Sequence, residues 1–321
     1  MKWAGHDAAW NEWRGAISGD RMHHGWILAG RKGLGKASFA HDAARELVAE
    51  SSVPQPAGNH PDIITLTNLP ANADEEKKQA EGKPFETKRS IGVAQIRAMQ
   101  QRLTTRPTLG SRRAIIIDTA DDLEKPAANA LLKSLEEPPA GTYFLLVSHR
   151  PGRLLATIRS RCRMLRFPEL TQPELAGILR QQAPQASEAA LAAAIAASAG
   201  SAGAALDFIE MDLASPYALM ARIADQGDPG FQLRGKLADA MGQKPERKRM
   251  LAGLDLARAV LAERLQSCAD SPGLLRLIDA HAQMVRLSGQ APTYNFDPGL
   301  LVLEIGGLLA SAAMDRERAD G

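Results

Sequence analysis

Aromatic residues are scarce in this sequence: Phe, Trp and Tyr together make up 4% of its 321 residues. The core must therefore be built mainly from Ala, Leu, Ile and Val, and little aromatic surface is left for stacking on bases. Cysteine is almost absent as well. The two cysteines, Cys162 and Cys268, lie far apart in the sequence, which excludes a disulfide framework and a zinc site made from cysteines of this chain.

Long apolar runs are also missing. No stretch of about 18 consecutive apolar residues occurs, so no membrane span is expected. Residues 1–7 lack the apolar segment of a secretory signal peptide, and we therefore expect a cytoplasmic protein.

The formal net charge of +2 conceals an uneven distribution. Residues 1–166 hold 25 Lys and Arg against 18 Asp and Glu, a balance of +7, whereas residues 167–321 hold 14 against 19, a balance of −5. A basic first half joined to an acidic second half predicts that only the first half faces a polyanion.

Short apolar runs alternate with helical patterns through the first half of the chain. The predicted strands are residues 25–30, 62–66, 113–118 and 143–148, and the predicted helices are residues 36–50, 91–103 and 126–137. Continuously apolar strands that alternate with helices predict an α/β domain with a parallel sheet. Residues 70–90 are polar and charged and are predicted to form a surface loop.

The second half of the chain is predicted to be all-helical. Residues 187–206 are rich in alanine, with Ser187 as the expected N-cap, and Asp297-Pro298 is expected to begin the last helix. We predict three domains and a tail: an α/β domain at 1–167, a small helical domain at 168–212, a larger helical domain at 213–315 and a frayed tail at 316–321.

A phosphate-binding loop is predicted where the first strand meets the first helix. The segment matches G-x-x-x-x-G-K through Gly30, Gly35 and Lys36, with a further glycine at Gly33. The glycines let backbone N–H groups surround a phosphate, and Lys36 would reach the terminal phosphates. The position that should hold Mg²⁺ through a hydroxyl is Ala37, so Mg-nucleotide binding is expected to be weak.

The third predicted strand ends at Asp118, where a carboxylate would lie near Mg²⁺. Many hydrolases place a glutamate directly after it to polarise the attacking water. Here that residue is Thr119, which cannot act as a general base. Magnesium ligation and water activation are therefore both weakened, although Asp118 could also be a plain strand-end residue.

Arg161 follows the fourth predicted strand. An arginine there can serve its own site, pair with a carboxylate, or reach across an interface as an arginine finger. The alternative is an ordinary surface arginine in a basic run with Arg159, Arg163 and Arg166.

A second basic group lies beside the third predicted strand and consists of Arg97, Arg102, Arg106, Arg112 and Arg113. We take Arg97, Arg102 and Arg106 as candidates for DNA phosphate contacts, with a solvated basic face as the alternative. Binding through phosphates would be non-specific and steeply salt-dependent.

Three segments carry a family resemblance: Ile116–Asp121, Asn129–Pro139 (NALLKSLEEPP) and Ser160–Cys162. Together they closely resemble clamp-loader subunits of the AAA+ superfamily, and the second segment is highly specific to that family. Leu154–Cys162 and Gly200–Leu206 are most similar to the delta prime family of bacterial DNA polymerase III subunits. The resemblance is strong over the first predicted domain, moderate over the second and limited to length and character over the third.

The resemblance implies a P-loop AAA+ module, a helical lid and a C-terminal collar that joins five subunits in a ring. It also implies that Arg161 acts in trans as an arginine finger at the ATP of a neighbouring subunit. Asp118 becomes a degenerate Walker B residue, and Ser148, or else His149, falls at the sensor 1 position.

Two family features are missing from this sequence. ATPase subunits carry an arginine in the sensor 2 region, but residues 200–206 contain none. Many members insert a four-cysteine zinc module, but residues 50–62 contain no cysteine, so neither zinc nor another metal is expected.

The implied function is that of a non-hydrolysing subunit that helps load a sliding clamp onto primed DNA during replication. The implied partners are motor ATPase subunits, the delta subunit, the clamp and primer–template DNA, in a hetero-pentameric ring without a membrane partner. The chain would belong to a DNA-directed DNA polymerase holoenzyme without being an active ATPase, and its binding of ATP or ADP would be weak or structural. The alternative is a catalytically active AAA+ ATPase, either a clamp-loader motor subunit or a related DNA-processing ATPase.

Overall fold

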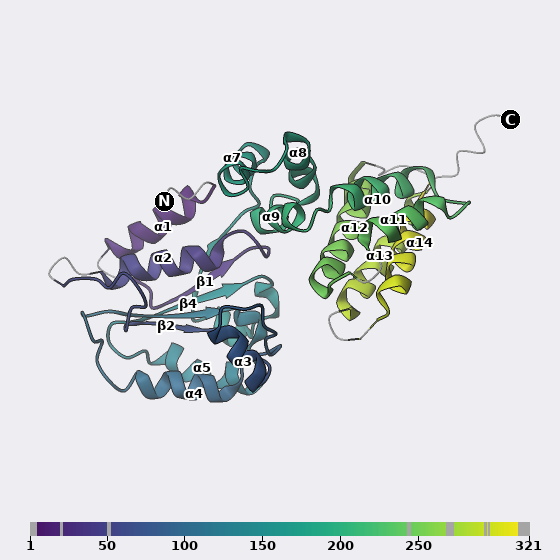
Figure 1. Cartoon of the computed structure of the whole chain (residues 1–321). Coiled ribbons are helices and arrows are strands. Elements are labelled where there is room, and N and C mark those ends of the chain that lie inside the picture. The colour runs from purple at the N-terminus through teal and green to yellow at the C-terminus, as the bar shows by residue number, and fades with distance from the viewer. Residues whose placement is uncertain are drawn as a thin grey trace. The chain divides into compact units, whose positions relative to one another are not determined.

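The computed structural model describes residues 5–19, 22–49, 53–242, 245–267, 273–291, 294 and 296–313. The chain divides into two compact units, Met1–Glu169 (unit 1) and Leu170–Gly321 (unit 2), both drawn in Figure 1. The division into three domains, with boundaries after residues 167 and 212, stays a prediction. Cys268 and the predicted tail at 316–321 lie outside the described residues.

Unit 1 is built on a five-stranded sheet in the order β2-β3-β4-β1-β5, and every neighbouring pair is parallel. The strands are β1 (Gly25–Ala29), β2 (Ile63–Leu66), β3 (Arg113–Asp118), β4 (Thr142–Ser148) and β5 (Arg163–Arg166). The central strands β1, β3 and β4 are almost wholly buried because helices cover both faces of the sheet. The predicted α/β class with a parallel sheet is confirmed.

The edge strand β5 was not predicted. Its sequence, Arg-Met-Leu-Arg, has arginines at both ends and only Leu165 buried, so it has the composition of a basic surface run. Pairing with the buried strand β1 makes it a strand, which is a tertiary effect that the local sequence does not show.

The helices of unit 1 lie in two layers against the sheet, as Figure 1 shows: α1 and α2 on one face, α4 and α5 on the other. Their bounds are α1 (Asp7–Ile17), α2 (Lys36–Val48), α3 (Ala73–Ala80), α4 (Val93–Arg102), α5 (Lys125–Glu136) and α6 (Ala156–Arg159), with short 3₁₀ turns η1 (Ala120–Asp122) and η2 (Pro151–Arg153). Alternate strand residues such as Ile115 and Ile117 pack with Ile96 and Leu131 of α4 and α5 to form the core of that layer.

The prediction of a loop over residues 70–90 is wrong in part, because α3 forms within it. Asn72 caps this helix by accepting hydrogen bonds from the backbone N–H groups of Asp74 and Glu75. Acidic residues in the first turn and lysines in the last turn suit the helix dipole. These start and stop signals were present in the sequence, but the highly polar composition masked them.

Five aromatic side chains of unit 1 pack together in one layer. Trp10 and Trp13 of α1 pack against Phe39 of α2, at ring-centre distances of 4.3 and 6.4 Å. Trp13 also meets Trp26 of β1 at 5.5 Å, and Phe39 meets Phe167 at 5.0 Å. These rings fill the core between α1, α2 and the sheet.

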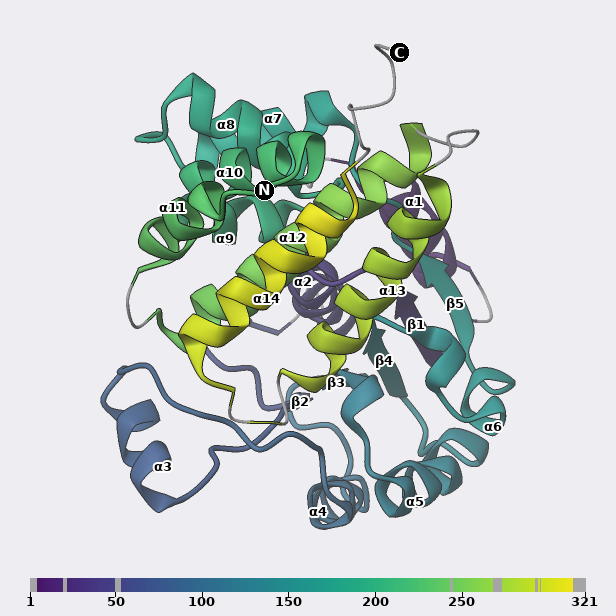
Figure 2. The same ribbon diagram turned by 90° about the vertical axis from the view of Figure 1, so that its right-hand side faces the viewer.

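Among its described residues, unit 2 contains helices and no strand. They are α7 (Gln172–Gln182), α8 (Glu188–Ala197), α9 (Ala202–Glu210), α10 (Ala214–Gln226), α11 (Gln232–Met241), α12 (Arg247–Ser267), α13 (Leu274–Gln290) and α14 (Pro298–Ser311). Figure 2 shows α12, α13 and α14 packed alongside one another. The all-helical prediction for this part of the chain is confirmed.

The alanine-rich stretch at 187–206 is helical as predicted and divides between two helices, α8 and α9. Ser187 is the N-cap of α8 as predicted, because its hydroxyl accepts from the N–H of Ala190 at 3.2 Å. The chain then breaks at Ala199 and Gly200, whose φ angles are +46° and +75°. Ser201 caps the second helix by accepting from the N–H of Ala204.

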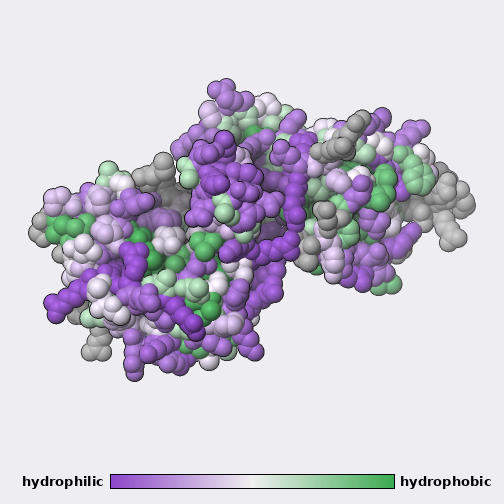
Figure 3. Space-filling model, turned by 60° about the horizontal axis from the view of Figure 1, so that its bottom comes forward, coloured by the Kyte–Doolittle hydropathy of each residue, from purple (hydrophilic) through white to green (hydrophobic). Residues whose placement is uncertain are grey.

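The face shown in Figure 3 is mostly hydrophilic, with separate hydrophobic patches between the polar side chains. No helix within the described ranges combines the length and the apolar character needed to cross a bilayer.

Candidate functional site

The glycine-rich loop between β1 and α2 has the backbone geometry that the motif predicts. Gly33 and Gly35 have φ angles of +80° and +78°, a region that residues with a side chain rarely adopt. Gly30 is required for a different reason: a Cβ atom there would lie 2.5 Å from the carbonyl oxygen of Phe167. Each of the three predicted glycines is therefore demanded by the local fold.

The loop lysine is satisfied by its own loop. Lys36 is 2% exposed, and its Nζ donates hydrogen bonds to the carbonyl oxygens of Gly30 at 2.7 Å and Arg31 at 2.5 Å. Burial lowers the pKa of Lys36 to about 8, and the nearby carboxylates of Asp121 and Asp118 partly oppose this shift. Two of its three ammonium protons are thus engaged by backbone carbonyls.

Asp118 lies at the carboxyl end of β3, at the same edge of the sheet as the glycine-rich loop. Burial raises the pKa of its carboxyl group, while the charges of His41 and Lys36 act in the opposite direction. Thr119 follows it directly, and Ala37 lies in the first turn of α2. Neither the hydroxyl of the loop motif nor the acidic partner of Asp118 is present at its expected position.

Asp121 is a site residue that the sequence interpretation missed. Its carboxylate accepts hydrogen bonds from the Ser148 hydroxyl at 2.9 Å and from the backbone N–H groups of His149 and Arg150 at 2.5 and 3.2 Å. The predicted sensor 1 residue, Ser148, is fully buried and donates its hydroxyl proton to this internal carboxylate. An acidic residue in the turn after β3 was the available signal, because such turns lie beside the end of the neighbouring parallel strand.

His149, the alternative sensor residue, is held neutral by its surroundings. Burial and then the charge of Lys36 lower its pKa to about 4, against the opposing effect of Asp121. Its Nδ1 atom is buried and has no hydrogen-bond partner among the described residues.

Arg161 lies beside the amino-terminal end of β1, whereas the glycine-rich loop follows the carboxyl end of the same strand. A Cβ on Gly25, the first residue of β1, would lie 3.1 Å from the Arg161 carbonyl oxygen, whereas the loop begins after Ala29 at the other end of the same strand. At roughly 3.3 Å per residue, that strand separates the two by about 16 Å. The Arg161 backbone is therefore remote from the phosphate loop of its own chain.

The Arg161 guanidinium is anchored at the surface. Its Nη2 forms an ion pair with Oε1 of Glu136 at 2.6 Å, and its Nη1 donates to the carbonyl oxygen of Thr157 at 2.9 Å. The side chain keeps 33% of its surface exposed. Of the alternatives left open by the sequence, pairing with a carboxylate is observed within the chain.

The basic group beside β3 contains both exposed and buried residues. Arg97, Arg102 and Arg106 are exposed. Arg113, in contrast, is 4% exposed and pairs with the fully buried Asp62 at 3.6 Å, so its inclusion in a DNA-facing group is wrong. It is the first residue of β3, and its guanidinium points into the protein, where it meets the carboxylate of Asp62 and donates to carbonyl oxygens of residues 102, 105 and 106.

Within the described part of the chain, no three or more His, Cys, Asp or Glu side chains come together in a way that could bind a metal ion.

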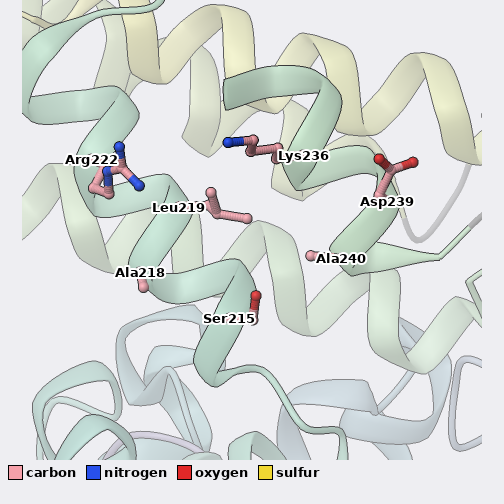
Figure 4. Close-up of a pocket in the computed structure, with 7 residues that line it drawn as sticks. All are labelled: Ser215, Ala218, Leu219, Arg222, Lys236, Asp239 and Ala240. Carbon is pink, nitrogen blue, oxygen red and sulfur yellow. The ribbon is translucent and has the colours of Figure 1, made fainter. Parts of the chain in front are cut away.

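A pocket of about 400 Å³ lies between α10 and α11 of unit 2, shown in Figure 4. Its lining is Ser215, Ala218, Leu219, Arg222, Lys236, Asp239 and Ala240. None of the predicted site residues takes part in it.

Comparison with known proteins places residues 5–171, just over half of the chain, in the family described as DNA polymerase III, delta subunit. The DNA polymerase III subunit delta' of Pseudomonas aeruginosa is 33% identical over 168 residues, which cover 48% of this chain and 45% of that protein. The subunit delta' of Escherichia coli is 34% identical over 158 residues, covering 45% and 42%. The chain thus matches less than half the length of these relatives.

Similarity extends more weakly to other proteins. The DNA polymerase III subunit gamma/tau of Mycobacterium tuberculosis is 30% identical over 173 residues, covering 52% of this chain and 29% of that protein. Among solved structures, a DNA polymerase III gamma subunit-related protein of Thermotoga maritima has a TM-score of 0.46 at 18% identity, covering 94% of this chain and 98% of that one. The Thermotoga maritima RuvB Holliday junction branch migration motor has a TM-score of 0.48 at 19% identity, covering 93% and 87%.

Proposed function

Because this chain belongs to the DNA polymerase III delta subunit family, we propose that it is a delta prime-type subunit of a bacterial clamp loader. In this role it helps to open the sliding clamp and to place it on primer–template DNA without hydrolysing ATP itself. Its partners are the motor ATPase subunits, the delta subunit, the clamp and DNA, in a hetero-pentameric ring within the cytoplasm. One observation carries the proposal. The phosphate loop has its full backbone geometry, but the side chains that hydrolysis needs are either absent or hydrogen-bonded to other groups of this chain.

The loss of hydrolysis is supported by four features of the site. Lys36 donates to the carbonyl groups of its own loop, and Ala37 offers no hydroxyl to Mg²⁺. Thr119 cannot activate water, and the Ser148 hydroxyl is engaged by Asp121. A phosphate entering this loop would compete with two backbone carbonyl groups for the ammonium group of Lys36. Binding of ATP or ADP is therefore weak or structural.

A titration of the isolated chain with ATP and ADP, with and without Mg²⁺, tests this part of the proposal. We expect weak binding that Mg²⁺ does not strengthen, and no ATP turnover above a buffer control. Magnesium-dependent turnover by the isolated chain would favour the alternative, an active AAA+ ATPase.

Arg161 is proposed to act in trans at the ATP bound by a neighbouring motor subunit. Its position at the edge of the sheet opposite to its own phosphate loop supports this assignment, as does the exposure of its guanidinium. Loss of an arginine finger costs on the order of 10³–10⁵ in rate at the site it serves, and less in a complex with several active sites.

The test is DNA-stimulated ATP turnover of the reconstituted complex with Arg161→Ala. Arg166→Ala is the matched control, because Arg166 is an exposed arginine of the same basic run. We expect turnover and clamp loading to fall with the first variant and to be unchanged with the second. Unchanged turnover with Arg161→Ala refutes the finger assignment.

Unit 2 is proposed to supply the lid and the collar that joins the subunits. Exposed apolar side chains recur along one stripe of α13, at Leu275, Ile278 and Val285, and α14 has two more at Leu300 and Leu303. A spacing of three and seven residues places such side chains on one helix face, which suits packing against a partner helix.

Contact with DNA phosphates through Arg97, Arg102 and Arg106 remains part of the proposal. Because such contacts release counterions, replacing one of these arginines by glutamine should weaken DNA binding of the complex and reduce its salt dependence. Binding that does not vary with salt would exclude this role.

A further inference from the structure

Arg161 is held from two sides by groups of its own unit. Oε1 of Glu136 accepts from Nη2 at 2.6 Å, and the carbonyl oxygen of Thr157 accepts from Nη1 at 2.9 Å. A guanidinium has five N–H donors in a planar fork, so these two anchors set its orientation and leave other donors for a ligand.

Glu136 contacts Arg161 and not the other arginines of the basic run. Arg159 donates to the carbonyl oxygens of Leu154 and Gly152, and so fixes the turn in which it lies. Arg163 pairs with Glu12 and lies over the ring of Trp26. The carboxylate at the end of α5 therefore serves one arginine of the run.

The location of Glu136 is unfavourable for its own helix. It is the last residue of α5, where the partial negative charge of the helix dipole disfavours a carboxylate and favours a cation. Glu137 follows immediately and adds a second negative charge. Helix stability thus does not account for a glutamate at this position, whereas the ion pair with Arg161 does.

We propose that Glu136 is a positioning residue for Arg161, which holds the guanidinium at the surface in an orientation that can meet a phosphate of the neighbouring subunit. This inference rests on the proposed function of Arg161 in trans. Without Glu136, the long arginine side chain would sample more rotamers, and fewer of them would place its donors for the transition state.

The expected effect is modest because the pair is partly exposed, at 33% for Arg161 and 48% for Glu136. Ion pairs of this kind contribute roughly fivefold at most to an equilibrium. We therefore expect Glu136→Gln to lower the kcat of DNA-stimulated ATP turnover by about two- to fivefold, with the KM for ATP changed less than about twofold.

The experiment is a double-mutant cycle in the reconstituted clamp loader, with wild type, Glu136→Gln, Arg161→Ala and the double variant. Glu137→Gln is the matched control, because it removes a neighbouring exposed carboxylate from the same helix end. Glu136→Asp is a second test variant: it keeps the charge at the helix end but withdraws it from Arg161. Thermal unfolding of each isolated chain verifies folding.

Glu136→Gln and Glu136→Asp should both lower kcat, Glu137→Gln should not, and Glu136→Gln should have no effect in the Arg161→Ala background. An equal effect in both backgrounds would show that Glu136 acts independently of Arg161 and would overturn the proposal. So would unchanged kcat in Glu136→Gln when Arg161→Ala is impaired, and this result leaves the finger assignment intact. If Arg161→Ala itself has no effect, the proposed function of Arg161 fails and the positioning role fails with it.

Discussion

Replacing Arg113 by methionine should destabilise unit 1 strongly, because it removes one partner of a buried ion pair. The guanidinium pairs with Asp62 and donates to the carbonyl oxygens of Arg102, Thr105 and Arg106. Methionine has a similar length and apolar stem, so little cavity is created. The main loss is therefore electrostatic.

The magnitude follows from what remains after the substitution. Removing one partner of a buried pair costs about 3–5 kcal/mol, because the other charge is left uncompensated. Asp62 keeps two hydrogen bonds from the backbone N–H groups of Thr108 and Leu109, at 2.7 and 2.8 Å. These bonds stabilise its carboxylate, and we therefore expect a loss at the lower end, about 3 kcal/mol.

Urea unfolding followed by tryptophan emission is the suitable assay. All four tryptophans, at positions 3, 10, 13 and 26, belong to unit 1, so the signal reports the unfolding of that unit. The exposed Arg97→Met is the control and should change stability by less than about 0.5 kcal/mol. Adding Asp62→Asn to Arg113→Met should restore part of the loss, since it removes the unpaired charge.

Two results would refute this reasoning. A loss below about 1 kcal/mol for Arg113→Met would mean that the pair contributes no more than a surface ion pair. Additive losses for Asp62→Asn and Arg113→Met would mean that the two groups are not coupled.

Three further predictions concern other parts of the chain. The pKa of His149 is lowered from 6.5 to about 4, so between these pH values the unfolded state binds more protons than the folded state. Unit 1 should therefore lose stability as the pH falls from 6.5 to 4. In urea unfolding measured at both pH values, the His149→Gln variant should lose less stability than the wild type. Burial raises the pKa of the Cys162 thiol to about 12, so little reactive thiolate is present in the folded chain at pH 8. In a Cys268→Ser variant, which leaves Cys162 as the one cysteine, iodoacetamide at pH 8 should alkylate the native chain at least about tenfold more slowly than the chain unfolded in urea. Asp297 is the N-cap of α14 and accepts from the N–H of Leu300 at 2.9 Å. Asp297→Ala should therefore lower the stability of unit 2 by about 1 kcal/mol, measured by unfolding followed through the helical circular dichroism signal. An unchanged midpoint of the unfolding transition would exclude a stabilising cap.

Elements with a strong local signal were predictable from the sequence. The continuously apolar strands β1, β3 and β4, the glycine-rich loop and the caps at Ser187 and Asp297 all lie where the sequence pattern indicated. In each case the cause lies within a few neighbouring residues. The strands are buried on both faces, the loop requires glycine conformations, and each cap side chain accepts a hydrogen bond from an N–H of its own helix.

Features that depend on distant neighbours were not predictable. Arg113 belongs to a run of arginines, and only the position of Asp62 beside it makes the guanidinium a buried group. Likewise, the role of Asp121 depends on the end of β4, which lies 27 positions further along the chain at Ser148. The number of arginines in a segment does not show which of them lie at the surface and which are buried and hold a loop in place.

Gly30 has a consequence for how phosphate-loop motifs are interpreted. Its missing side chain leaves room for the backbone of Phe167, whose N–H donates to the carbonyl oxygen of Ala29 and whose ring packs against Phe39. A substitution at Gly30 would therefore disturb the join between β5 and the aromatic core even in a chain that never meets a nucleotide. Packing against Phe167 is enough to require the first glycine of the motif. Its presence in a sequence therefore does not indicate that the protein binds or hydrolyses ATP.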